Sequence, residues 1–154
     1  MTAHVTQAPL AELPAARPRY LRVAVPVGRV FFAAIFVISA FGHFRPDTVA
    51  YAAESGVPMA GLAVPLSGVI ALLGGLSVML GFKARAGALL VALFLVPVTV
   101  MMHPFWTLGD PQAAMAQQTH FLKNLSMLGG ALLLLYFGAG PMSVDARRRP
   151  RVAG

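Results

Sequence analysis

The sequence contains no cysteine and few acidic residues, and both absences limit what the protein can be. Without cysteine, the chain cannot form a disulfide, a thiolate-bound metal or iron–sulfur site, or a C-x-x-C redox pair. Only 5 of its 154 residues are acidic and 11% are charged, whereas about a quarter of the residues of soluble domains are charged. Hydrophobic residues make up 58% of the chain, and the mean hydropathy is +0.75. The composition indicates an integral membrane protein with one compact membrane domain.

Four apolar segments are long enough to cross a bilayer as helices, for which about 20 residues suffice. The predicted spans are residues 23–44, 59–81, 86–102 and 121–140. We expect a partial helix at the membrane interface within residues 47–57, and a polar loop at residues 107–119. The predicted fold class is therefore an all-α integral membrane protein, a four-transmembrane-helix bundle. The predicted divisions are a flexible tail at 1–22, the membrane domain at 23–141 and a basic tail at 142–154.

The basic residues predict how the bundle is oriented. With both termini on one side of the membrane, ten of the 12 basic residues lie on that side, and only Arg45 and Lys123 lie opposite. The positive-inside rule makes the basic side cytoplasmic, so both termini are predicted to be cytoplasmic. The net charge of +7 is then explained by topology. The expected partner is the lipid bilayer, and no nucleic-acid partner is expected.

Polar side chains gather at the outer ends of the predicted spans. Three different spans each place a histidine there, and two nearby loops add an acid and a tryptophan. Ionisable groups at a membrane level usually pair, line a polar pocket or reach water. We therefore predict an outward-facing ligand pocket but assign no catalytic residue. The pocket candidates are Ser39, His43, Glu54, His103, Trp106, His120, Lys123 and Asn124.

Three interpretations of these histidines stay open. Neutral imidazoles suit zinc or copper, but no H-x-x-x-H spacing supports a shared ion, and no metal is assigned. Histidine, lysine and asparagine donors beside aromatic rings suit a quinone head group or a small anion, and a histidine could pass protons to it. In the third interpretation each histidine only solvates a helix end, while Lys123 extends to the interface. The cofactor is therefore unknown, with a quinone as the candidate.

Arg29 is the one charged residue inside the first predicted span. It either extends its side chain to the cytoplasmic interface or forms an internal anchor. In the anchor interpretation, its guanidinium would donate to carbonyls of the fourth span or to Tyr136.

Two segments resemble the DoxX family of small bacterial membrane proteins. They are GRVF at 28–31 leading through IFVISAFGHF at 35–44, and HFLKNL at 120–125 followed by GGA at 129–131. The resemblance implies a four-helix bundle in the bacterial inner membrane and a role near electron-transfer or oxidative-stress systems. It implies no agreed catalytic set. Ala40 and His43 stand where the family often has glycine and lysine, which separates His43 from a shared family role.

The functional hypothesis joins these observations. We expect a multi-pass protein of the bacterial inner membrane that serves as a subunit of an electron-transfer or oxidative-stress system and binds a quinone or another small ligand at the outer pocket. The alternative is a non-enzymatic assembly partner or a carrier of a small solute. Whether the protein is an enzyme stays open. The expected protein partner is a redox protein or a second copy of the chain.

Overall fold

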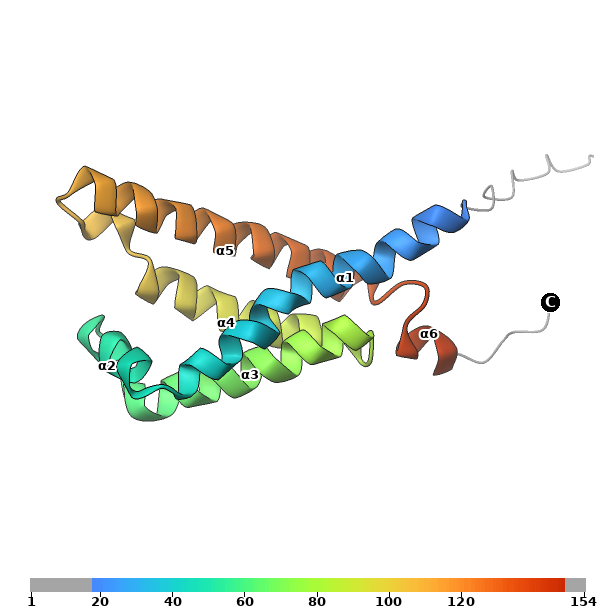
Figure 1. Ribbon diagram of the computed structural model, residues 1–154, viewed down its shortest axis with the longest axis horizontal. Helices are drawn as coiled ribbons and strands as arrows, with labels where there is room; N and C mark the ends of the chain where they lie inside the picture. The colour runs from blue at the N-terminus through green and yellow to red at the C-terminus, as the bar shows by residue number, and fades with distance from the viewer. Residues whose placement is uncertain (1–17, 149–154) are drawn as a thin grey trace, which may run out of the picture.

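The computed structural model describes residues 18–148, and every regular element in that range is a helix. Four of the helices, α1, α3, α4 and α5, are long and apolar enough to cross a membrane. This confirms the predicted all-α bundle of four spans (Figure 1). In chain order the elements are α1 (Arg19–Ala40), η1 (Phe41–Phe44), α2 (Pro46–Glu54), α3 (Ala60–Leu80), α4 (Ala84–Met102), η2 (Phe105–Thr107), α5 (Pro111–Phe137) and α6 (Val144–Arg148).

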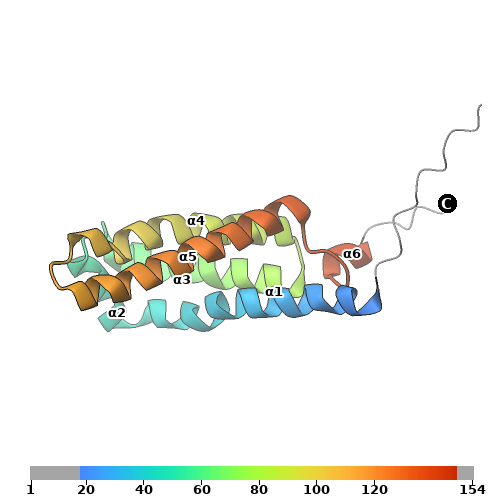
Figure 2. The ribbon, with the colours of Figure 1, turned by 90° about the horizontal axis from the view of Figure 1, so that it is seen from above.

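The four long helices pack in a simple order. α1 lies against α3, α3 against α4, and α4 against α5 (Figures 1 and 2). The tight turn at 81–83 makes α3 and α4 antiparallel neighbours. The start of α1 and helix α6 lie at one end of the bundle, which we call the inner end (Figure 1). α2 and the start of α5 lie at the opposite end, the outer end.

Small residues of α3 let it pack closely between its two neighbours. A Cβ atom at Gly74 would lie 3.0 Å from the carbonyl oxygen of Gly87 on α4. A Cβ atom at Gly75 would lie 3.0 Å from Cγ2 of Val37 on α1. Helices in lipid associate through such close packing, because burial from water does not drive them together there. The small residues of this span therefore serve helix packing.

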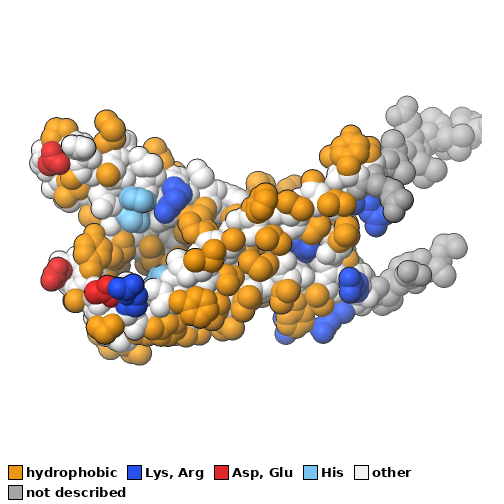
Figure 3. All heavy atoms as spheres, in the orientation of Figure 1, with side chains coloured by type: hydrophobic (Ala, Val, Ile, Leu, Met, Phe, Trp, Pro, Cys, Tyr) orange, Lys and Arg blue, Asp and Glu red, His pale blue; other side chains and the backbone are white. Residues whose placement is uncertain are grey.

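Large apolar side chains cover much of the outer surface of the bundle. Phe31 and Leu133, on α1 and α5, are 77% and 61% exposed. The space-filling view shows hydrophobic side chains along the visible sides of the long helices (Figure 3). In a soluble protein an apolar surface of this extent would favour aggregation, whereas lipid tails cover it in a membrane.

The structure corrects two boundaries and confirms one short element. The predicted loop at 107–119 is wrong for most of its length, because α5 begins at Pro111. Asp110 caps this helix by accepting a hydrogen bond from the Ala113 amide at 2.9 Å, and proline suits the first helical turn. The same helix ends at Phe137, three residues before the predicted end at 140. The partial helix expected within 47–57 is α2.

The predicted tails are only partly within the described range. Residues 19–22, assigned to the N-terminal tail, already form the first turn of α1. Residues 143–148, assigned to the basic C-terminal tail, contact the turn between α3 and α4, and the Asp145 amide donates to the Gly81 carbonyl at 2.8 Å. Residues 1–17 and 149–154 lie outside the described residues.

Candidate functional site

The outer end of the bundle is hollowed between α5 and the η1–α2 segment (Figure 3). We call this hollow the outer cleft. In the inner half of the bundle α1 and α5 approach each other, and a Cβ atom at Gly130 would lie 2.8 Å from the Phe32 ring. Toward the outer end the two helices diverge (Figure 1). Histidine and basic side chains appear on both sides of the hollow, so this end carries the polar chemistry expected from the sequence (Figure 3).

His103 and His120 come together on the α5 side of the outer end. Their rings stack with centroids 5.3 Å apart and an angle of 25° between planes. Nδ1 of His103 lies 2.7 Å from Oε1 of Gln117, and Lys123 follows His120 by one helical turn. We call these four residues the polar cluster. It offers hydrogen-bond donors and acceptors together with one fixed positive charge.

Gln117 is a site residue that the sequence prediction missed. Its position three residues before His120 places both side chains on one helical face, provided that the helix already exists there. The predicted loop at 107–119 hid this relationship. The Asp110-Pro111 pair was the available signal, since aspartate at the N-cap and proline at the first position are typical of a helix start.

Aromatic rings hold the α4–α5 connection against α5. The Phe105 ring lies 5.1 Å from the ring of Trp106 and 5.5 Å from that of Phe121, and the Trp106–Phe121 distance is 5.8 Å. All three pairs have edge-to-face geometry, which aromatic rings favour. Trp106 is 56% exposed, as expected for an aromatic side chain at the membrane interface. The candidate Trp106 therefore packs on Phe121, the residue that follows His120.

His43 lies apart from the other two histidines. Its ring is 5.6 Å from that of Phe94 on α4, and its Nδ1 lies 3.0 Å from the carbonyl oxygen of Ser39. Ser39 therefore contributes its backbone to this contact. Among the described residues, no group of three or more histidine, cysteine or acidic side chains is placed to hold a metal ion. The structure thus brings two of the three predicted histidines together and leaves the third in another environment.

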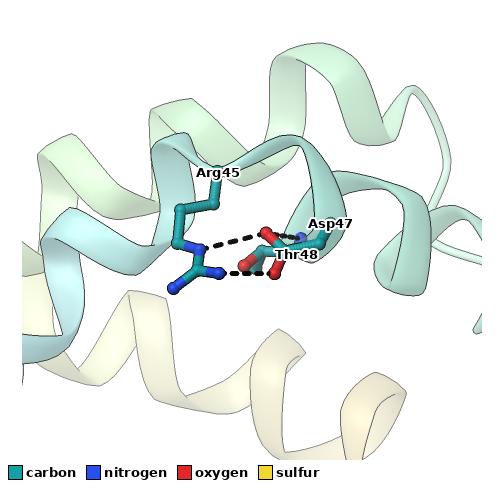
Figure 4. Close-up of polar contacts among 3 residues, drawn as sticks. All are labelled: Arg45, Asp47 and Thr48. Carbon is teal, nitrogen blue, oxygen red and sulfur yellow. Dashed lines mark hydrogen bonds and ion pairs between the residues drawn. The ribbon is translucent and has the colours of Figure 1, made fainter.

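Arg45 and Asp47 form a two-point ion pair at the mouth of the outer end (Figure 4). Nε of Arg45 donates to Oδ1 of Asp47 at 3.1 Å, and Nη2 donates to Oδ2 at 2.9 Å. The backbone amide of Thr48 also donates to Oδ1 at 3.1 Å. Hydrogen bonding from the Arg45 guanidinium lowers the pKa of the Asp47 carboxyl. Both oxygens of this carboxylate therefore already accept hydrogen bonds from Arg45 and Thr48.

Lys123 forms no ion pair within residues 18–148. Two acidic residues at the outer end already have other partners. Asp47 pairs with Arg45, and Asp110 caps the N-terminus of α5. Glu54 is exposed at the end of α2 and also forms no ion pair in this range. The exposed ammonium group of Lys123 is therefore available to water or to a ligand.

Asn124 differs from its neighbours because it is buried. Only 4% of its surface is exposed, and none of the hydrogen bonds between described side chains involves its amide. It follows Lys123 and lies one turn after His120 on the same face of α5, but it is buried whereas His120 and Lys123 are exposed.

Arg29 forms an internal anchor at the inner end, although its acceptor differs from the predicted one. Its side chain is 4% exposed, and Nη2 donates to the Met142 carbonyl at 2.9 Å. Met142 follows α5 and precedes α6. The Tyr136 carbonyl instead accepts from Nη2 of Arg85 at 2.9 Å. Arg85 therefore binds the last turn of α5, and Arg29 holds the chain just after it.

Comparison with known proteins relates the chain to other membrane proteins. The SURF4 family pattern matches residues 63–150. Inner membrane protein YphA of Escherichia coli (strain K12) is 34% identical over 136 residues, which is 86% of this chain and 93% of the relative. Inner membrane protein YqjF of the same organism is 31% identical over 125 residues, 80% of this chain and 90% of the relative.

A shorter similarity reaches a yeast protein. ER-derived vesicles protein ERV29 of Saccharomyces cerevisiae is 27% identical over 70 residues, 46% of this chain and 22% of the relative. No solved structure matches the chain. The two bacterial relatives and the four apolar helices confirm the predicted location, a multi-pass protein of the inner membrane.

Proposed function

The chain belongs to the SURF4 family, and on that premise we propose that it is an inner-membrane subunit that binds a small ligand at its outer end, with a quinone head group as the first candidate. The resemblance of residues 28–44 and 120–131 to the DoxX family is part of this proposal. It favours a role near electron-transfer or oxidative-stress systems over an unrelated membrane function.

The stacked pair of His103 and His120 carries this proposal. Two imidazoles, the Gln117 amide and the Lys123 ammonium group lie together at the outer end. A few convergent polar groups over apolar walls are typical of small-ligand sites. Imidazoles can hydrogen-bond the carbonyl or hydroxyl oxygen of a quinone, and the ammonium group favours an oxygen atom with partial negative charge.

The proposed subunit needs a protein partner for electron transfer. The chain has no cysteine, and no metal-ligand cluster occurs among residues 18–148. A quinone bound at the outer end would therefore exchange electrons with a carrier on another protein. This places the chain as the quinone-binding part of an assembly.

Ligand binding at the polar cluster can be measured through Trp106, the one tryptophan of the chain. A quinone bound near the Phe105–Trp106–Phe121 group is expected to quench its fluorescence. We expect purified protein in detergent to show saturable quenching by a short-chain ubiquinone. Replacing His120 or Lys123 by alanine should weaken binding about tenfold, the effect of losing one net hydrogen bond.

The matched control is Lys83→Ala, which removes an exposed lysine from the turn between α3 and α4 at the inner end. Its affinity for the ubiquinone should equal that of the unmodified protein. Quenching that does not saturate, or an affinity unchanged in both His120→Ala and Lys123→Ala, would contradict the proposal.

The second candidate function is a non-enzymatic assembly partner. The similarity to a protein named for ER-derived vesicles supports a role in membranes for this candidate as well. A small-solute carrier is less well supported, since Phe36 and Leu95 fill the middle of the bundle with exposures of 2% and 1%. Affinity purification from native membranes distinguishes the candidates. A companion with a redox cofactor supports the quinone-binding subunit, and a companion without one supports the assembly role.

A further inference from the structure

A cavity of about 300 Å³ lies at the outer end, between η1, α2, α3 and α4. Residues from α2, the 57–58 turn, α3 and α4 form its walls, and nearly all of them are apolar. Its volume is at the lower end of the range for ligand-binding cavities. Ala52, Val57, Val64, Val98, Met101 and Met102 are among the lining residues.

His43 supplies the main polar group of this cavity. Its Nδ1 lies 3.0 Å from the Ser39 carbonyl oxygen, and a carbonyl oxygen can only accept a hydrogen bond. Nδ1 must therefore carry the hydrogen. In the neutral imidazole this leaves Nε2 with an unshared electron pair, ready to accept a hydrogen bond from a ligand.

Two hydroxyl groups, of Ser67 and Thr48, also lie at the cavity wall, and they differ in whether they are free to bind a ligand. The Ser67 hydroxyl donates to the Val64 carbonyl at 2.7 Å, within its own helix. No side-chain hydrogen bond of Thr48 occurs among the described residues, although its backbone amide binds Asp47. A ligand head group would therefore meet the His43 Nε2 atom and the Thr48 hydroxyl, while its remaining surface would contact apolar walls.

We propose that this cavity takes the apolar chain of a membrane amphiphile whose head group carries a hydroxyl, and that this hydroxyl donates to Nε2 of His43. The proposal rests on the proposed function, because a quinol is one amphiphile of this class. It names the hydrogen-bonding group and places the chain of the ligand in the cavity between α2, α3 and α4.

The chemistry of the walls favours a chain over a compact polar ligand. A polar solute would lose hydrogen bonds to water on entering a cavity with so few donors and acceptors. An alkyl or isoprenoid chain loses none and gains dispersion contacts with the alanine, valine and methionine side chains. Methionines such as Met101 and Met102 adapt their shape easily, which suits a flexible chain.

The test measures binding of n-decyl hydroquinone to purified protein in detergent micelles by native mass spectrometry. We expect one bound molecule of decyl hydroquinone per protein. Hydroquinone without the chain should bind at least about tenfold more weakly. Ala63→Phe and Ser67→Leu each place a larger side chain at the cavity wall and should weaken binding of the decyl compound about tenfold or more. Ala86→Phe, at an exposed position near the inner end, is the matched control and should bind normally.

The head-group contact has its own test. His43→Phe keeps an aromatic ring beside Phe94 but removes Nε2, so it should weaken binding of decyl hydroquinone while binding of decane stays unchanged. Competition separates two natural sources of the ligand. If decyl alcohol displaces bound decyl hydroquinone as effectively as added decyl hydroquinone does, the natural ligand is a lipid alcohol. If only added decyl hydroquinone displaces it, the natural ligand is a quinol.

The outcomes distinguish this site from the polar cluster. If Ala63→Phe and Ser67→Leu, both folded by their thermal unfolding, bind decyl hydroquinone normally, the cavity proposal is overturned. If they lose binding while His120→Ala and Lys123→Ala retain it, the cavity proposal stands and the quinone site at the polar cluster fails.

Discussion

Gly68 of α3 lies directly against His43 of η1. A Cβ atom at Gly68 would stand 2.7 Å from the Cβ of His43 and 3.0 Å from the carbonyl oxygen of Ala40. Non-bonded carbon atoms do not approach so closely at equilibrium. The absence of a side chain at Gly68 therefore lets the end of α1 cross α3, and it sets the position of His43 at the wall of the cavity.

Replacing Gly68 by alanine should push η1 away from α3 and displace His43. Overpacking of this kind typically costs about 1–3 kcal/mol of unfolding free energy. We expect lower thermal stability in detergent and weaker binding of decyl hydroquinone. Gly61→Ala is the control on the same helix, because no atom lies within 4 Å of a Cβ atom there. Equal stability and affinity of the two variants would show that the contact with His43 does not constrain the fold.

The Arg45–Asp47 pair predicts a specific dependence on pH. Hydrogen bonds from Arg45 lower the pKa of Asp47 in the folded protein, so the carboxylate binds its proton less readily than in the unfolded chain. The stability from this pair is fully present above the unfolded pKa of about 3.9 and is lost as pH falls through the folded value.

An NMR titration of the Asp47 carboxyl carbon should therefore show a midpoint below that of an aspartate in an unstructured peptide. The pair is exposed, so Asp47→Asn should change thermal stability at neutral pH only slightly. Arg45→Gln is the matched change on the other partner and should raise the titration midpoint toward the ordinary value, because Arg45 is the largest cause of the lowered pKa. A midpoint at or above the ordinary value in the unmodified protein would refute the ion pair in solution.

Arg29 makes one favourable hydrogen bond, but two of its other side-chain nitrogens are buried without a partner among the described residues. Its Nη2 donates to the Met142 carbonyl, but Nε and Nη1 are buried without a hydrogen-bond partner among the described residues. A hydrogen bond from a charged group contributes about 1.5–3 kcal/mol, and each buried unpaired donor costs about 1–3 kcal/mol. Replacement by an apolar side chain of similar length should therefore change global stability little.

We expect Arg29→Met to leave the thermal unfolding temperature nearly unchanged but to release the chain after α5. Limited proteolysis at residues 142–148 measures that release and should be faster than in the unmodified protein. Arg22→Met, at an exposed position on α1, is the control and should not change the cleavage rate. Cleavage as slow in Arg29→Met as in this control would show that Arg29 does not anchor the segment.

The sequence predicted the spans of the fold well because they depend on local composition. Uncharged stretches of sufficient length identify membrane helices, and small residues such as Gly74 and Gly75 mark close helix contacts. The start of α5 was missed because glutamines at 112, 117 and 118 interrupt the apolar pattern. There the helix depends on the Asp110 cap, and not on an apolar face.

The candidate site was harder to predict because it depends on how helices are arranged. His43, His103 and His120 lie at one membrane level in the sequence pattern, yet only the last two stack. Nothing in the spacing of residues shows which neighbour each histidine faces. The cavity beside His43 was not predicted either, because alanine, valine and methionine side chains carry no chemical signature of a site.

Asp145 of α6 caps the N-terminus of α4 across the inner end of the bundle. Its Oδ1 accepts from the Lys83 amide at 2.7 Å, and its Oδ2 accepts from the Ala84 amide at 3.0 Å. The first amides of a helix have no acceptor within the helix, so this carboxylate satisfies two groups that would otherwise lack a partner. Negative charge is also favourable at a helix N-terminus.

Asp145→Ala should therefore destabilise the protein by about 1–2 kcal/mol, the usual effect of losing an N-cap. Asp145→Asn keeps one acceptor oxygen and should lose less. Thermal unfolding in detergent measures both changes. Glu54→Ala removes an exposed carboxylate at the end of α2 that forms no ion pair within residues 18–148, and it should leave the unfolding temperature unchanged. If Asp145→Ala is as stable as Glu54→Ala, the packing of α1, α3 and α4 alone holds the inner end together.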